Sequence, residues 1–245
     1  MPKATVKSDT RVKADSRIKP EAEPGPRSKR AAILRSAVEC FGEVGYEHTK
    51  WSEVADRVGI GQTALYYYFE SKAHCLLTIM RLELTRSWER FMEATADLPP
   101  AEGLRAAIGA AYQVTEHEVL QMRILHSHMD LLASPRASAR EEEERSASRE
   151  LVRRIEGEWA SLVARGMDDG SFAPGDARLT ARGVLGFVVS IWTWYRPGGS
   201  MALPELSSFV EGSVLRMVGA ADTTPATKPA STRSARRARP ARSRA

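Results

Sequence analysis

The segment 49–72 constrains the fold more than any other part of the chain, because it contains two short helical patterns separated by a tight turn. Over 52–58 the apolar residues fall on one side of a helix. Gly59 permits the left-handed backbone conformation that ends a helix, and Gly61 is a suitable N-cap for a second helix over 62–69. This spacing predicts a helix-turn-helix.

The second helix of this segment has two different sides. Leu65 and Phe69 are one helical turn apart, so they share a face and are expected to pack inward. The neighbouring arc carries polar and flat-ringed side chains, which are Gln62, Thr63, Tyr66 and Tyr67. Such an arc suits the major groove of DNA. The alternative is a short amphipathic hairpin whose tyrosines are half-buried against a neighbour, and the pattern alone leaves both open.

The same residues resemble the recognition helix of TetR-family transcriptional regulators. The positions that match the family pattern are Gly59, Leu65, Tyr66, Phe69 and Lys72. The similarity covers about 28–80 and implies a helix-turn-helix DNA-binding domain over 28–72, with the motif itself at about 51–70. Two positions depart from the pattern, because Lys50 stands where the family usually has Thr or Ser, and Gly61 where it usually has Ser.

The helix pattern and the resemblance together give a set of expected DNA contacts. Gln62 and Thr63 are expected to read base edges, and Tyr66 is expected to add apolar contact. The complete set is Thr49, Lys50, Trp51, Gln62, Thr63, Ala64, Tyr66, Tyr67 and Lys72. The partner implied is double-stranded DNA.

Phosphate contacts are expected from Thr49, Tyr67 and Lys72. Thr49 is also a candidate to cap the first helix of the motif, or else Lys50 replaces a neutral phosphate contact with a charged one. Neither departure from the family pattern predicts a base preference.

Basic charge gathers at the two ends of the chain. Residues 1–30 contain nine Lys or Arg and four Asp or Glu, and residues 221–245 contain seven and one. The whole chain carries +5, so residues 31–220 carry −6. Both ends are poor in large apolar residues, which predicts a disordered basic arm over 1–27 and a disordered basic tail over 221–245. Such ends attract DNA phosphates, and the alternative is that they serve solubility alone.

Several classes of protein are disfavoured by what the sequence lacks. There is no long apolar run and no signal peptide, so a cytoplasmic, nucleoid-associated protein without a membrane partner is expected. Cys40 and Cys75 fit buried thiols, with a redox switch as the alternative. His126 and His128 do not share a helix face, so no metal site is expected. An enzyme is disfavoured, because no nucleophile elbow, Gly-rich phosphate loop or metal-spaced His/Cys cluster is present, and no cofactor is expected.

Helical patterns cover the rest of the chain, and strand-like alternation is absent. Further helices are expected at about 28–44, 72–95, 101–115, 118–133, 141–166, 176–195 and 203–218. The prediction is an all-α fold of about nine helices, with an N-terminal three-helix domain and a helical ligand-binding and dimerisation domain over 73–220. Ser71 is expected to cap the long fourth helix, which would link the two domains. The acidic run 141–144 is expected to be the solvated start of a helix.

The helix expected at 176–195 is apolar over most of its surface, so it needs burial on more than one side. One side is expected to face its own domain, and the other a second subunit. A homodimer with a four-helix interface follows, and two-fold symmetry implies a near-palindromic operator. The residues expected at this interface are Trp194, Tyr195, Leu206, Phe209, Val210 and Val214.

The aromatic and Met residues of the second domain are numerous enough to line an apolar cavity, although each is also a suitable core residue. The expected ligand-binding residues are Trp88, Met92, Tyr112, Met122, His126, Trp159, Phe187 and Trp192. Ligand binding is expected to pivot the fourth helix and lower the affinity for DNA, as in a repressor that a small apolar molecule releases from its operator.

A segment near the C-terminus resembles TetR-type regulators of fatty-acid and steroid degradation. The matching positions are Trp192 or its neighbours, Trp194, Tyr195, Arg196, Pro197 and Gly199. The resemblance implies an acyl-coenzyme A effector, with an apolar tunnel for the acyl chain and a surface Arg or Lys near the phosphates. The alternatives are that the segment only shapes the dimer interface, that the effector is aromatic or drug-like, or that the protein is an architectural DNA-coating protein.

Overall fold

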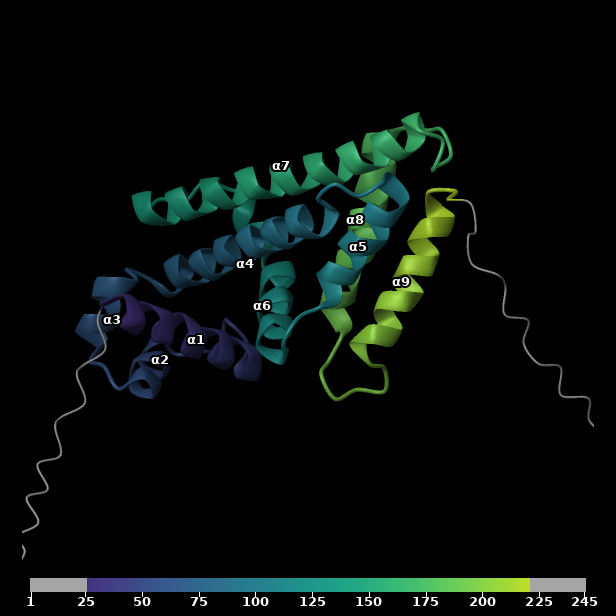
Figure 1. Ribbon diagram of the computed structural model, residues 1–245. Coiled ribbons are helices and arrows are strands. Elements are labelled where there is room, and N and C mark those ends of the chain that lie inside the picture. The colour runs from purple at the N-terminus through teal and green to yellow at the C-terminus, as the bar shows by residue number, and fades with distance from the viewer. Residues whose placement is uncertain (1–25, 221–245) are drawn as a thin grey trace, which may run out of the picture. The chain divides into compact units, whose positions relative to one another are not determined.

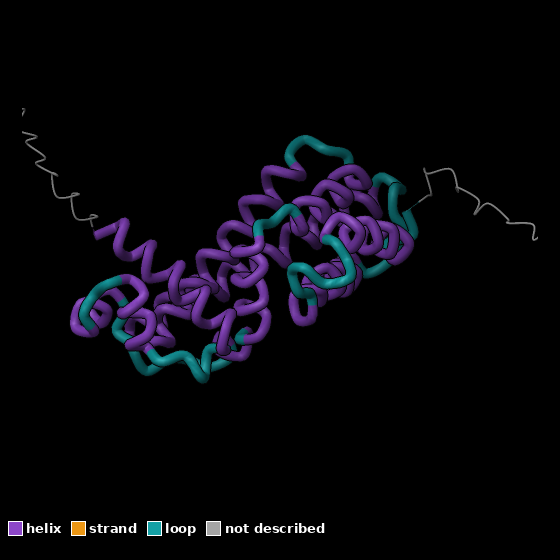
Figure 2. The backbone as a smooth tube through the Cα atoms, turned by 90° about the horizontal axis from the view of Figure 1, so that it is seen from below, coloured by secondary structure: helices purple, strands orange, loops and turns teal. Residues whose placement is uncertain are grey.

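The computed structural model describes residues 26–220, and this part of the chain is helical with no strand (Figures 1 and 2). Its elements are α1 (Pro26–Val44), α2 (Trp51–Val58), α3 (Gln62–Tyr68), α4 (Lys72–Thr95), α5 (Pro100–Tyr112), α6 (Glu116–Ser127), η1 (Met129–Leu132), α7 (Ala139–Asp168), α8 (Ala177–Trp194) and α9 (Leu203–Met217). The predicted all-α fold of about nine helices is confirmed for the described residues. The tail expected over 221–245, and all but residues 26 and 27 of the arm expected over 1–27, lie outside them. No helix within 26–220 is long and apolar enough to cross a membrane.

The chain divides into two compact units, and the division falls after Cys75, inside α4. The first unit contains α1, α2, α3 and the first turn of α4. The second contains the rest of α4 and all later helices. The two units are therefore joined by a continuous helix.

The first unit is organised around a small apolar core and one glycine turn. The buried side chains include Ile33, Ala37, Val38, Phe41, Val54, Ala55, Leu65 and Phe69. Gly59 has φ 70°, and its amide donates to the carbonyl of Asp56, so α2 ends in the left-handed cap that the sequence predicts. Ser71 caps α4 as predicted, because its hydroxyl accepts from the amide of His74.

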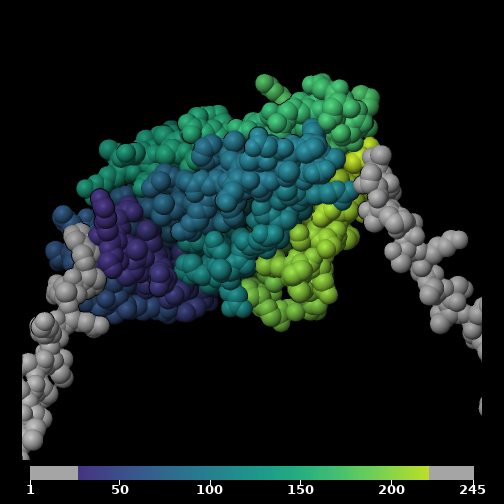
Figure 3. All heavy atoms as spheres, viewed as in Figure 1, coloured from purple at the N-terminus to yellow at the C-terminus, as the bar shows by residue number. Residues whose placement is uncertain are grey.

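The second unit is held together by α5, α7, α8 and α9. Helix α7 packs along α8, and α5 packs against both α7 and α9; the space-filling view shows α9 lying directly on α5 (Figure 3). The core residues include Leu104, Ile108, Leu162, Val163, Val184, Val188, Leu206, Val210 and Val214. Tyr112 ties α5 to α8, because its hydroxyl donates to the carbonyl of Val188 at 2.6 Å.

The single helix expected at 118–133 is wrong in its second half. Helix α6 ends at Ser127, His128 leaves helical geometry with φ −127° and ψ 23°, and Met129–Leu132 forms a short 3-10 helix instead. The carbonyl of Leu132 accepts a hydrogen bond from the guanidinium of Arg145 at 3.1 Å. This contact from α7 stabilises the break, and periodicity in a single segment cannot reveal it.

The acidic run 141–144 lies at the start of a helix as predicted, but the expectation that it is solvated is wrong for two of its four residues. Glu141 and Glu144 are buried. Glu144 is bound by Arg81 and accepts from the Thr78 hydroxyl at 3.0 Å, both of which lie on α4. Glu141 accepts from Arg136 at 2.9 Å. Buried carboxylates need such partners, because an unpaired charge is costly to remove from water.

Candidate DNA-binding surface and effector cavity

Helix α3 places its buried and exposed residues as the sequence predicts. Leu65, and Phe69 directly after the end of α3, are fully buried in the core of the first unit. Tyr66 is 52% exposed and Tyr67 is 78% exposed. The shorter side chains of this exposed face are Gln62, Thr63 and Ala64. A convex face that combines hydrogen-bonding groups with two exposed rings is suited to base edges and phosphates.

Thr49 does not have the role that the sequence predicts. Its side chain is buried, and its hydroxyl lies 2.8 Å from the carbonyl oxygen of Gly45 and 3.2 Å from that of Cys40. The residue at the N-cap of α2 is Lys50, whose side chain makes no capping bond. Thr49 therefore neither caps α2 nor presents its hydroxyl to a phosphate, because it instead holds the loop after α1.

The side chain of Lys72 is also hydrogen-bonded within the protein. Its ammonium group donates to the carbonyl oxygens of Tyr46, Glu47 and Thr49 at 2.6, 3.3 and 3.1 Å, and it lies 4.4 Å from the centre of the Tyr46 ring. An ammonium has three donors, and all three have partners. The phosphate contact expected of Lys72 stays a prediction, and within the protein this side chain ties the start of α4 to the loop before α2.

The remaining residues of the expected set lie at the start of α2. Lys50 is exposed. Trp51 is half-buried, and its indole Nε1 is buried without a hydrogen-bond partner among residues 26–220. In the same unit, the guanidinium of Arg30 lies 4.6 Å from the centre of the Phe69 ring and so holds α1 against the end of α3. No sequence pattern indicates this Arg30 contact.

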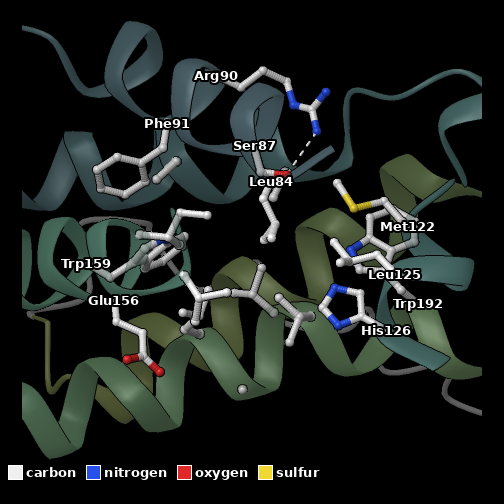
Figure 4. Close-up of a pocket in the computed structure, with 18 of the residues that line it drawn as sticks. Leu84, Ser87, Arg90, Phe91, Met122, Leu125, His126, Glu156, Trp159 and Trp192 are labelled. Atoms are coloured by element: carbon white, nitrogen blue, oxygen red, sulfur yellow. Dashed lines mark hydrogen bonds between the residues drawn. The ribbon is translucent and has the colours of Figure 1, made fainter. Parts of the chain in front are cut away.

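The second unit contains a cavity of about 290 Å³ between α4, α5, α6, α7 and α8. Its wall is largely apolar. Four of the eight expected ligand-binding residues line it, and they are Met122, His126, Trp159 and Trp192. In Figure 4, Trp159 and Glu156 lie at one end, whereas Met122, His126 and Trp192 lie at the other. Phe91 and Leu84 contribute from α4.

The other four expected residues lie outside the cavity wall. Tyr112 is buried behind Trp192, with 5.5 Å between the ring centres. Phe187 faces Phe209 at 6.4 Å, Met92 is exposed, and Trp88 is half-buried on α4. A helix position alone does not determine which neighbouring helix a side chain meets, so the sequence could not separate these four from the lining residues.

The polar groups around the cavity are largely neutralised. Burial lowers the pKa of His126 to about 4, so this imidazole is uncharged at neutral pH. Arg90 lines the wall and donates to the fully buried Glu83 at 2.8 Å. Burial raises the pKa of Glu83, while the Arg90 contact acts in the opposite direction. The resulting wall suits an apolar ligand, and the Glu83–Arg90 pair is not apparent from sequence spacing.

The expected dimer residues fall into two groups. Trp194 and Phe209 are 51% and 59% exposed. Tyr195, Leu206, Val210 and Val214 are buried in the core of their own chain, which corrects their assignment to a contact between subunits. The exposed apolar side chains that the sequence analysis missed on α8 and α9 are Leu179 and Met217.

The segment after α8 forms a tight turn. Gly198 has φ 75°, a conformation that glycine adopts without strain, and the amide of Gly199 donates to the carbonyl of Arg196 at 3.1 Å. Arg196 is exposed. Burial, and to a smaller degree the charge of Arg196, lower the pKa of Arg123 on α6. Two guanidinium groups therefore lie near one another at this turn.

Comparison with known proteins identifies the family. The family model described as "Bacterial regulatory proteins, tetR family" matches residues 33–79, and the model described as "Tetracyclin repressor-like, C-terminal domain" matches residues 97–218. The HTH-type transcriptional activator FasR of Mycolicibacterium smegmatis is 28% identical over 114 residues, which cover 45% of this chain and 51% of FasR. The chain thus spans about half the length of that relative.

Two further similarities extend over most of the described residues. The fatty acid metabolism regulator protein of Bacillus subtilis is 24% identical over 192 residues, covering 75% of this chain and 92% of that protein. The crystal structure of AibR in complex with isovaleryl coenzyme A and operator DNA has a TM-score of 0.63 and 21% identity, covering 78% of this chain and 99% of AibR. This chain belongs to the TetR family of bacterial regulatory proteins.

Proposed function

We propose that this protein is a sequence-specific DNA-binding transcriptional regulator whose affinity for its operator is lowered by a small apolar effector. The observation that carries the proposal is the exposed face of α3, where Tyr66 and Tyr67 remain uncovered opposite the buried Leu65. Adjacent exposed apolar side chains that form one patch often mark an interaction site. A cavity in the same chain supplies a place for the effector.

The DNA contacts are assigned to the exposed residues of the expected set. Gln62 and Thr63 read base edges, and Tyr66 adds apolar contact with them. Tyr67 and Lys50 contact phosphates, because both are exposed. Ala64 and Trp51 border this surface. Thr49 and Lys72 are instead assigned to supporting this surface from within the domain.

Dimerisation is assigned to the exposed apolar residues of α8 and α9. Trp194 and Phe209, together with Met217, give these two helices an outer apolar face. Covering that face with its symmetry-related copy would remove it from water. A two-fold dimer of this kind carries two recognition helices and requires a near-palindromic operator.

The effector class best supported is an acyl-coenzyme A thioester. The cavity is apolar, and its volume of about 290 Å³ lies at the lower end of the range for ligand sites, which favours a short or medium acyl chain. The named functions of two similar proteins, fatty acid metabolism and the binding of isovaleryl coenzyme A, point to the same class. Trp159 and Trp192 would flank the chain from α7 and α8.

Helix α4 connects ligand binding to DNA binding in this proposal. Leu84 and Phe91 of α4 line the cavity, and the first turn of the same helix belongs to the unit that carries α3. A ligand that fits only one position of α4 shifts the population toward that position. Coupling of about 1–3 kcal/mol would weaken operator binding 5- to 150-fold.

The DNA-binding part of the proposal is tested by selecting duplexes from a randomised pool with the full-length protein and measuring their binding by fluorescence anisotropy. A near-palindromic consensus should emerge, and it should bind at least about a thousandfold more tightly than random duplex. Equal affinity for the selected and random duplexes would contradict sequence-specific regulation and favour nonspecific DNA coating.

A further inference from the structure

A second, more polar cleft of about 640 Å³ lies between α7 and α8. Its polar lining residues are Arg153, Glu156, Asp176, Arg178 and Arg182. The larger, mostly apolar wall of the cavity described above includes three charged residues, Arg90, Glu156 and Arg182. The second unit therefore has an apolar compartment and a charged one formed in part by the same two helices.

The two compartments are adjacent. Glu156, Arg182 and Leu185 line both of them. Arg182 and Gly186 are exposed, so the cavity reaches the surface at the end where it meets the cleft. Figure 4 places Glu156 at the opposite end of the cavity from His126. A ligand that enters the cavity with one end therefore emerges beside the cleft.

Helical spacing explains why the two compartments differ. On α7, Ile155 and Trp159 lie one turn apart and line the cavity, whereas Arg153 and Gly157 lie one turn apart on the adjacent stripe and line the cleft. Glu156 falls between the two stripes. Neighbouring faces of one helix thus provide an apolar wall and a charged wall.

The three arginines of the cleft differ in their counter-charges. Arg153 pairs with Glu150 at 2.5 Å, and Arg182 approaches Glu156 at 3.7 Å. Arg178 has no carboxylate partner within residues 26–220. The side chains of Arg178 and Arg182 are one turn apart on α8, so a single anionic group can contact both.

We propose that this cleft binds the phosphorylated head group of the effector, with Arg178 and Arg182 as its phosphate ligands. The inference rests on the proposed function, because it assumes that the apolar chain of the same molecule occupies the cavity. Guanidinium groups are well suited to phosphate oxygens, since they donate two parallel hydrogen bonds. The assigned ligand is an acyl thioester of a phosphorylated carrier such as a nucleotide-bearing thiol.

The junction between the compartments argues against a free fatty acid. A carboxylate at the end of the chain would meet Glu156 and Arg182, which already pair with each other, so it gains little attraction at this junction. A thioester is neutral at this junction, and the negative charges of its carrier are on the phosphates, which would lie in the cleft. A free acid would also leave Arg178 without a counter-charge.

Two variants test the binding of the head group separately from the binding of the acyl chain. Arg178→Ser removes the unpaired cation of the cleft, and Arg149→Ser is its matched control, because Arg149 is an exposed residue of α7 that lines neither compartment. Gly157→Leu fills the cleft without changing charge. A Cβ at Gly157 meets no atom within 4 Å, and leucine favours a helix more than glycine does, so this variant is expected to fold.

The experiment is isothermal titration calorimetry of the full-length protein and its variants with octanoyl-coenzyme A, with octanoyl-pantetheine, which has the same thioester but no phosphate, and with octanoate. Wild type is expected to bind octanoyl-coenzyme A at least about tenfold more tightly than octanoyl-pantetheine, because charge-assisted hydrogen bonds to phosphate are lost in the latter. Arg178→Ser and Gly157→Leu should each remove most of that difference and leave octanoyl-pantetheine binding unchanged. Arg149→Ser should keep it.

The outcomes distinguish the two proposals. If octanoyl-pantetheine and octanoyl-coenzyme A bind wild type equally, or if Arg178→Ser behaves like Arg149→Ser, the head-group site is wrong while the acyl cavity stands. If octanoate binds as tightly as the coenzyme A ester, the junction does not discriminate against a free acid, and the assignment of a thioester is wrong. If no octanoyl compound binds at all, the proposed effector class fails, and the head-group site fails with it.

Discussion

The recognition face of α3 and the effector cavity are built in opposite ways. The recognition face is convex, and its residues lie within seven consecutive positions, Gln62–Tyr68. The cavity is concave, and its wall combines side chains between Leu84 and Trp192 from five α-helices and the 3-10 helix η1. The first surface is determined by one helix and its turn, whereas the second exists only when distant segments pack correctly.

This difference has a consequence for stability. Exposed side chains such as Tyr67 make few contacts inside the protein, so they can be changed with little effect on folding. Cavity residues such as Trp159 and Trp192 are also part of the core, so ligand binding and stability are coupled there. Substitutions on the two surfaces should therefore have separable effects on DNA binding and on unfolding.

The largest effect is expected for the double substitution Gln62→Ala and Tyr66→Ala. Operator affinity should fall on the order of 100-fold, because a base-reading hydrogen bond and an apolar contact are both removed. The free energy of unfolding should change by no more than about 0.5 kcal/mol. Anisotropy and urea denaturation measure the two quantities.

The exposed Gln113→Ala is the matched control for this pair, because Gln113 lies in the second unit and outside the proposed surface. It should leave operator affinity unchanged. Comparable losses for Gln113→Ala, or an unfolding free energy reduced by several kcal/mol in the double variant, would remove the claim that recognition and stability are separable on α3.

A smaller effect, on stability alone, is expected at His126. Burial lowers its pKa to about 4, from the value near 6.5 of an unfolded chain, so between these pH values the unfolded state binds more protons. Stability therefore rises with pH across this window and falls as pH decreases through it, by about 3 kcal/mol in total. Denaturation between pH 4 and 7 of wild type and of His126→Leu measures the difference.

The His126→Leu variant should lose that part of the pH dependence while carboxylate titration, common to both proteins, remains. Identical pH profiles for the two proteins would mean that His126 is not buried in its neutral form. The measurement uses the difference between profiles, so it does not depend on the absolute stability of either protein.

Lys72→Met should reduce stability by about 1–2 kcal/mol, because the carbonyl oxygens of Tyr46, Glu47 and Thr49 lose a charged donor. Operator affinity should fall only to the extent that the lost hydrogen bonds destabilise the DNA-binding domain. The slope of affinity against salt concentration should remain that of wild type. Unchanged stability with a flatter salt slope would restore Lys72 as a phosphate ligand.

The smallest effect is expected for Lys50→Ser, which places at this position a residue usual in the family. Because Lys50 is exposed and its side chain makes no capping bond, the substitution should leave stability unchanged or raise it slightly. Operator affinity should decrease about threefold, and the salt slope should decrease by about one phosphate contact. An unchanged salt slope would exclude the charged phosphate contact.

The sequence predicted the local features of this fold well and the non-local ones poorly. The buried Leu65, the exposed Tyr66 and the left-handed Gly59 all follow from spacing within one helix or turn. Burial of Glu144 depends on Arg81, far away in the sequence, so periodicity suggested a solvated carboxylate. The same limitation separates Met122, which lines the cavity, from Tyr112, which packs behind it.

The expected dimer residues also show that a helical pattern does not identify the neighbour that covers a side chain. Val210 and Phe209 are adjacent in an apolar helix, but Val210 is fully buried in its own chain, whereas Phe209 is exposed. An apolar pattern indicates that a helix has two covered sides, although it does not say which side belongs to the same subunit. Only the packing of α9 against α5 and α8 assigns the two faces.

The most direct test of the account is operator binding measured by anisotropy with and without saturating octanoyl-coenzyme A, using the full-length protein and its selected operator. The account predicts that the ligand raises the operator Kd between 5- and 150-fold, and by linkage that operator DNA weakens ligand binding by the same factor. An unchanged operator Kd, with ligand binding verified by calorimetry in the same buffer, would show that the cavity and the recognition helix are not coupled.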